Sequence, residues 1–189
     1  MVKTIRLLAL DIDGVLTDGT TRIAADGTES KGLCFRDLDA MTQAGQMGLA
    51  VVLVTGESGP LVEMIARRFG VKEVMSGAKD KAAALREIAS RHQIRLAEIC
   101  YVGDSDRDAP AVGLAGLGLV PADATPKAKK SAHGVLETPG GKGVLAEIMT
   151  LLAGRIGSFG ETILRPAPSP SEPTPLPAAE ERGAGSGGG

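Results

Sequence analysis

The chain has 189 residues, with 21 basic and 23 acidic side chains and a formal net charge of −2. This length predicts one domain, and the balanced charge with an aromatic content of 2% argues against a nucleic-acid partner. No window approaches the ~20 apolar residues of a membrane-spanning helix, and two scattered cysteines form neither a disulfide framework nor a zinc site. We therefore expect a soluble, cytoplasmic protein without a membrane partner.

The first predicted strand covers residues 5–10 and ends on Asp11 and Asp13, with Gly14 directly after them. A nearly continuous apolar run is typical of a strand buried on both faces of a parallel sheet. Two carboxylates at the end of such a strand need compensation, and a divalent cation provides it. Beside a metal ion, Asp11 could attack an electrophile while Asp13 exchanges protons. The alternative is a simple Asp-Gly turn after an edge strand, against which the length of the whole motif argues.

A small β-hairpin is predicted across residues 19–35, where β-branched residues flank an Asp-Gly turn. It has few large apolar side chains, so it cannot build a core of its own. We expect it to stand off the sheet as a flap. The helix that follows is predicted to be capped by Asp37 or Asp39 and to end near residue 47.

Strands and helices alternate along the rest of the chain, and the strands are apolar runs. Further strands are predicted at 49–54, 71–75, 99–102, 117–120 and 133–136, and helices at 58–69 (capped by Ser58), 77–92, 108–114, 125–132 and 144–152. This order predicts an α/β fold, an open parallel sheet with helices on both faces and no large cap. The Pro- and Gly-rich composition of residues 155–189 predicts a disordered tail behind a domain of residues 1–154.

Acidic and hydroxyl side chains follow several of these strands. Asp11 and Asp13 follow the first strand, Thr55 follows the second, and Asp104 and Asp108 follow a later one. In an open parallel sheet the carboxyl ends of the strands share one edge, where ligands bind. Asp11, Asp104 and the carbonyl of Asp13 would supply hard oxygens to Mg²⁺, with Asp108 as a further ligand or an outer partner.

Three residues are candidates for binding a phosphate group. Thr55 offers a hydroxyl and Gly56 an amide, while Lys81 at the start of a helix offers a positive charge for a phosphate or for the carboxylates. Each is common in isolation, as a turn or as a solvated lysine. Their order and their shared position at strand ends predict a site.

These motifs together resemble the four motifs of the haloacid dehalogenase superfamily of phosphohydrolases. The run from Asp13 to Gly19 and the glycine-rich turn at 140–143 narrow the resemblance to the capless branch of this superfamily. That branch contains the 3-deoxy-D-manno-octulosonate 8-phosphate phosphatases and the phosphatase domains attached to acylneuraminate cytidylyltransferases. The resemblance implies a Mg²⁺-dependent phosphomonoesterase, with Asp11 as a nucleophile that forms an aspartyl-phosphate and Asp13 as general acid and base. It implies phosphate binding by Thr55, Gly56 and Lys81, and Mg²⁺ binding by Asp11, Asp13, Asp104 and Asp108.

The implied substrate is a small sugar phosphate, above all an ulosonic or nonulosonic acid phosphate. The sequence departs from the family pattern at Leu38, Glu57 and Lys142, positions around the sugar rather than the phosphorus. Arg36 and Lys142 are the candidates for substrate binding, and Arg22 and Lys31 could also meet an anionic substrate.

Two other functions stay open at this point. A phosphotransferase or sugar phosphomutase shares the aspartyl-phosphate, but it normally needs a cap that excludes water. A catalytically idle domain that regulates or oligomerises a partner synthase or cytidylyltransferase is the second. Because the flap is too small to close the site alone, we expect a neighbouring chain to complete it, in a homotetramer like that of the resembling family.

Overall fold

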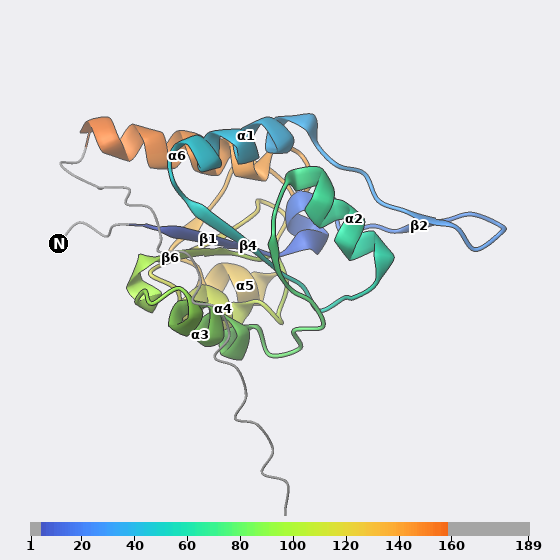
Figure 1. Cartoon of the computed structure of the whole chain (residues 1–189), viewed down its shortest axis with the longest axis horizontal. Helices are drawn as coiled ribbons and strands as arrows, with labels where there is room; N and C mark the ends of the chain where they lie inside the picture. Colours follow the sequence, from blue (N-terminus) through green and yellow to red (C-terminus); the bar gives the residue numbers. More distant parts are fainter. Residues whose placement is uncertain (1–4, 159–189) are drawn as a thin grey trace, which may run out of the picture.

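The computed structural model describes residues 5–158, which form a six-stranded sheet between two layers of helices and a separate two-stranded hairpin (Figure 1). The strand order is β5-β4-β1-β6-β7-β8, and every neighbouring pair is parallel. The strands are β1 (Leu7–Leu10), β4 (Ala50–Val54), β5 (Glu73–Met75), β6 (Ile99–Val102), β7 (Leu117–Val120) and β8 (Gly134–Val135). The predicted open parallel sheet is confirmed.

The two helical layers bury opposite faces of the sheet. One face packs against α1 (Phe35–Gln46), α2 (Pro60–Phe69) and α6 (Val144–Ser158), and the other packs against α3 (Lys81–Arg91), α4 (Ala109–Leu114) and α5 (Pro126–Ser131). Along β1, Leu8 and Leu10 enter the first core while Leu7 and Ala9 enter the second. Because a strand points successive side chains to opposite faces, a strand covered on both sides must be apolar throughout.

The predicted flap is also confirmed. It consists of β2 (Arg22–Ile23) and β3 (Glu29–Ser30), which pair antiparallel, and the hairpin projects away from the sheet (Figure 1). Residues 19–30 are all exposed. Gly27 closes the turn at a φ of 83°, a conformation that glycine adopts without strain.

The start of α1 differs from the prediction. The helix begins at Phe35 after Cys34, and neither Asp37 nor Asp39 caps it. Asp37 is instead buried and accepts hydrogen bonds from the backbone N–H groups of Leu145 (2.8 Å) and Ala146 (3.3 Å). The first turn of α1 lies beside the start of α6, so this carboxylate caps the neighbouring helix rather than its own.

Two other helix ends differ from the prediction. Gly59, at a φ of 104°, precedes α2 in place of the predicted cap Ser58. Helix α6 continues to Ser158, past its expected end near residue 152, since no proline occurs in the sequence from Pro139 until Pro166. The predicted tail therefore starts inside α6, and its residues 159–189 lie outside the described range. In the described range, no helix is long and apolar enough to cross a membrane.

The topology places a crevice at the end of β1. The chain builds β4 and β5 on one side of β1 and then crosses to build β6, β7 and β8 on the other side. Leu10 pairs with Leu53 of β4 and Val102 of β6, so the three strands end at the same level. Ligands bind at such a switch point in open α/β sheets.

Candidate active site

A cavity of about 510 Å³ opens at the carboxyl ends of β1, β4 and β6. The predicted site residues among those that line it are Asp11, Asp13, Thr55, Gly56, Lys81 and Asp104. A larger cavity of about 760 Å³ lies at the opposite ends of β4 and β5 and contains none of the predicted site residues. These six predicted site residues, which come from distant segments of the chain, therefore meet at one edge of the sheet.

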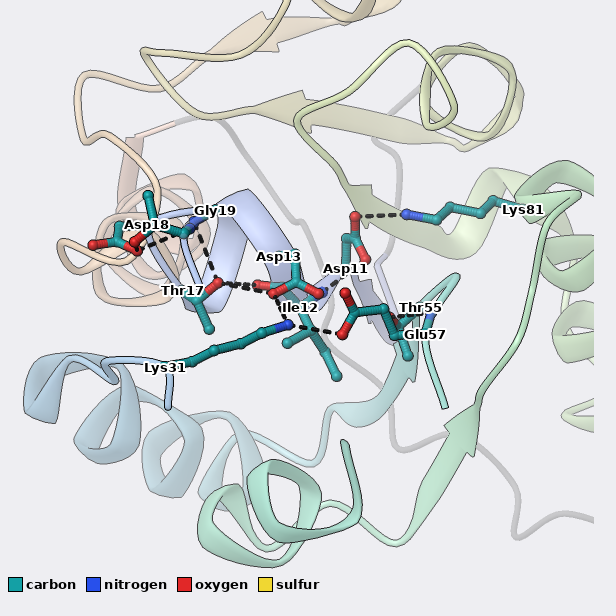
Figure 2. A network of polar contacts seen from close by, with 11 residues as sticks. Asp11, Ile12, Asp13, Thr17, Asp18, Gly19, Lys31, Thr55, Glu57 and Lys81 are labelled. Atoms are coloured by element: carbon teal, nitrogen blue, oxygen red, sulfur yellow. Dashed lines mark hydrogen bonds and ion pairs between the residues drawn. The ribbon is translucent and has the colours of Figure 1, made fainter. Parts of the chain in front are cut away.

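Asp11 is the first residue after β1, and its side chain is held at both oxygens. Oδ1 accepts a hydrogen bond from the N–H of Ile12 at 2.8 Å, and Oδ2 accepts one from Nζ of Lys81 at 2.5 Å (Figure 2). Asp11 is 4% exposed. The carboxylate thus has one fixed orientation at the base of the cavity, as a nucleophile requires.

Lys81 is the first residue of α3 and joins two carboxylates. Its Nζ atom lies 2.5 Å from Oδ2 of Asp11 and 2.7 Å from Oδ1 of Asp108. Burial alone would lower the pKa of Lys81, but the charges of Asp11 and Asp108 outweigh it and raise this pKa above its ordinary value. An ammonium group has three donors, so one remains for a ligand oxygen.

Asp108 is fully buried and accepts four hydrogen bonds. Oδ1 accepts from Lys81 and from the hydroxyl of Tyr101 (2.7 Å), and Oδ2 accepts from the N–H (3.1 Å) and Oγ (2.5 Å) of Ser105. Neither Tyr101 nor Ser105 was among the site residues predicted from the sequence. A signal was present for Tyr101, because a buried tyrosine in an aliphatic strand needs a partner for its hydroxyl.

Three carboxylates form a candidate cation site, and Asp104 is the most open of them. Oxygens of Asp11, Asp104 and Asp108 lie within 4.8 Å of one another. Burial, together with the negative charge of Asp108, raises the pKa of Asp11 to about 7 and that of Asp104 to about 6. Carboxylates that resist ionisation in this way are stabilised by a bound divalent cation, so the donor set fits Mg²⁺.

The loop after β4 offers donors on the opposite wall of the cavity. Oγ1 of buried Thr55 accepts a hydrogen bond from the N–H of Glu57 at 3.1 Å, which leaves the Thr55 hydroxyl proton for donation. Gly56 is exposed and lines the same wall. The two residues can bind an anionic oxygen between them.

Asp13 is held by Lys31, which directly follows β3 at the base of the hairpin, called here the flap root. Its Oδ1 atom accepts hydrogen bonds from Oγ1 of Thr17 (3.2 Å) and Nζ of Lys31 (2.6 Å), and Lys31 also binds Oε2 of Glu57 at 2.8 Å (Figure 2). Both short contacts of Lys31 are to carboxylates of the chain itself, so the expectation that Lys31 meets an anionic substrate stays a prediction.

The comparisons with known proteins agree with this geometry. Residues 57–148 match the model of the haloacid dehalogenase-like hydrolases. The 3-deoxy-D-manno-octulosonate 8-phosphate phosphatases of Yersinia pestis and Escherichia coli K12 are 32% and 33% identical to this chain over 148 and 150 residues, which are 78% and 79% of this chain and 79% and 80% of theirs.

The chain belongs to the haloacid dehalogenase-like hydrolases. Among solved structures, it is similar to the 3-deoxy-D-manno-octulosonate 8-phosphate phosphatase of Moraxella catarrhalis in complex with magnesium, phosphate and KDO. That structure gives a TM-score of 0.76 at 29% identity, over 79% of this chain and 86% of that one.

The cations expected to bind substrate lie elsewhere in this haloacid dehalogenase-like hydrolase. Nη2 of Arg36 donates to the carbonyl of Lys142 at 2.6 Å, and neither residue lines the cavity. The positive side chains that line it besides Lys81 are Lys79 and Arg107, both exposed and both missed by the sequence analysis. Arg107 lies in the loop between Asp104 and Asp108, and only these two carboxylates were predicted as site residues of that loop.

Gly14 controls the position of Asp104. It has a φ of 80°, and a Cβ at this position would collide with the Asp104 carboxylate. We expect Gly14→Ala to displace this candidate cation ligand and lower kcat by at least ~100-fold, as a misplacement near 1 Å does. Gly27→Ala is the matched control, since Gly27 has a φ of 83° but no atom within 4 Å of its added Cβ. Equal activity in the two variants would contradict the prediction.

The raised pKa values predict how stability depends on pH without a metal ion. The pKa values of Asp11 and Asp104 are about 7 and about 6 in the folded chain, against 3.8 in the unfolded chain. Between pH 3.8 and about 7, the folded state therefore binds more protons than the unfolded state. The free energy of unfolding consequently falls as the pH rises through this range. We expect the Tm in EDTA to fall by roughly 3 °C or more from pH 5 to pH 8. Added Mg²⁺ should raise the Tm more at pH 8 than at pH 5, because ionised carboxylates bind it better. A Tm in EDTA that rises over this range would contradict the assignment.

Proposed function

We propose that this chain is a Mg²⁺-dependent phosphomonoesterase that acts on a small sugar phosphate, an ulosonic or nonulosonic acid phosphate. One observation carries the proposal. The fixed carboxylate of Asp11 faces the same cavity as Asp104, Lys81 and the donors of Thr55 and Gly56. A nucleophile, a cation site and phosphate donors thus surround one space. The similarity to 3-deoxy-D-manno-octulosonate 8-phosphate phosphatases supports this substrate class.

Mg²⁺ would be held by the carboxylates of Asp11 and Asp104 and by the backbone carbonyl of Asp13. When bound, the ion supplies positive charge that offsets the repulsion between an anionic nucleophile and an anionic phosphate. Asp108 would support this site from behind, because both of its oxygens are already shared by Lys81, Tyr101 and Ser105.

The reaction would proceed in two displacements at phosphorus. An oxygen of Asp11 attacks in line, and the bond from phosphorus to the sugar oxygen breaks as that oxygen takes a proton from Asp13. Asp13 then removes a proton from water, whose oxygen attacks the aspartyl-phosphate and releases inorganic phosphate and free Asp11. The hydroxyl of Thr55, the amide of Gly56 and the third donor of Lys81 would stabilise the transferring phosphoryl oxygens.

Cations around the cavity would bind the carboxylate of the sugar. Lys79 and Arg107 line the cavity and are the first candidates within one chain. Arg36 and Lys142 remain proposed substrate contacts at the flap root, where Gly19 connects the flap to the cavity wall. Arg36 and Lys142 do not line the cavity in a single chain, so they would contact the substrate only when a neighbouring chain closes the site.

A homotetramer would provide that closure. The apolar side chain of Ile23 in the flap is 70% exposed, and Phe35 beside the flap root is 72% exposed. We infer that these two side chains, one on the flap and one at the start of α1, are buried against another copy in the tetramer. Light scattering should give the mass of a tetramer. A monomer with full activity at nanomolar concentration would contradict a shared site. The sequence has only two cysteines, far apart along the chain, which fits a reducing compartment and supports the proposal of a cytoplasmic location.

Substitution of the nucleophile tests the activity. We expect wild-type protein to release phosphate from 3-deoxy-D-manno-octulosonate 8-phosphate, within a panel of sugar and ulosonate phosphates, with Mg²⁺ and not with EDTA. Asp11→Asn should lower kcat at least ~100-fold, about 2.7 kcal/mol in the barrier, because an amide cannot attack phosphorus. A variant that keeps more than a tenth of the wild-type rate, with the fold intact by circular dichroism, would overturn the assignment.

A further inference from the structure

An ion pair between Lys31 and Glu57 joins the flap root to the loop after β4, directly beside Asp13. Lys31 belongs to the root of an exposed hairpin, yet its side chain is only 3% exposed. Its Nζ atom lies 2.6 Å from Oδ1 of Asp13 and 2.8 Å from Oε2 of Glu57. Figure 2 shows the lysine side chain ending at the two carboxylates, with one contact from its nitrogen to each. The bond to Glu57 fixes the end of the lysine that meets Asp13.

The contacts of Asp13 leave it with one preferred orientation. Lys31 and the hydroxyl of Thr17 both bind Oδ1, while Oδ2 accepts no hydrogen bond from the described part of the chain. Asp13 also lines the cavity. Charge-assisted hydrogen bonds such as that from Lys31 are among the strongest in proteins. One oxygen is therefore held on the flap side, and the other is left for a reacting group.

We propose that Lys31 and Glu57 are positioning residues for Asp13, Lys31 by direct contact and Glu57 by fixing Lys31. This inference rests on the proposed function, in which Asp13 gives a proton to the leaving oxygen and later takes one from water. Positioned acids and bases contribute ~10²- to 10⁴-fold to such steps. The same contacts also tie the flap to the cavity wall, so the test must separate positioning of Asp13 from a purely structural role.

p-Nitrophenyl phosphate provides that separation. Its p-nitrophenolate leaves without a proton, so formation of the aspartyl-phosphate on Asp11 does not need Asp13. Hydrolysis of the aspartyl-phosphate does need Asp13, because water must lose a proton. With a sugar phosphate, whose leaving alkoxide must be protonated, Asp13 is needed in both steps. A positioning role therefore affects the two substrates at different steps.

The central variant is Lys31→Met, which keeps the length of the side chain and removes its charge. In stopped flow with p-nitrophenyl phosphate and Mg²⁺, we expect a burst of p-nitrophenolate at nearly the wild-type rate constant, followed by turnover lowered ~10-fold or more. With 3-deoxy-D-manno-octulosonate 8-phosphate, single-turnover formation of the aspartyl-phosphate should itself slow. Glu57→Gln should show the same pattern to a smaller degree, since Lys31 keeps its bond to Asp13.

Two further variants complete the experiment. Lys31→Arg keeps a charged donor and should recover most of the lost turnover. Lys130→Met, which removes an exposed lysine of α5, should match wild-type protein. The proposal is overturned if Lys31→Met loses burst and turnover equally, which indicates structural damage, or if it loses neither. A wild-type protein that hydrolyses neither substrate would instead overturn the proposed function.

Discussion

The contact between the Lys81 ammonium and two buried carboxylates is the interaction on which the site depends. Asp11 follows the central strand and Asp108 follows β6, and both side chains are buried, so their negative charges would repel each other without a counter-charge. Lys81 enters from a third element, the start of α3, and neutralises part of that charge. The remaining hydrogen bonds of Asp108, from Tyr101 and Ser105, hold the lysine in place from behind.

Much of the fold and of the carboxylate cluster could be predicted from the sequence, because both follow from local rules. Continuous apolar runs mark strands that are buried on both faces, and residues just after parallel strands must share an edge. From this rule alone, Asp11, Thr55 and Asp104 were expected at one edge of the sheet, and all three line the same cavity. The helix ends were less predictable. The sequence pattern does not tell whether Asp37 caps its own helix or a neighbouring one, since that depends on how α1 packs against α6.

The contacts between loops could not be predicted from the sequence. Lys31 and Glu57 belong to segments that carry no regular pattern, and their meeting at Asp13 depends on the path of the flap root. Likewise, Arg36 and Lys142 are near each other but away from the cavity, whereas Lys79 and Arg107 line it. Charged side chains on loops can extend in several directions, so their partners follow from tertiary structure rather than from spacing.

The parallel pairing of β1 with β6 has a consequence for how the protein matures. The two strands lie side by side in the sheet, yet the carboxylates that follow them, Asp11 and Asp104, are separated by more than half of the described chain. A chain emerging from the ribosome can form the flap and β4 early, but it cannot bring these carboxylates together until β6 has been synthesised and has docked. Metal binding thus stabilises only the finished sheet.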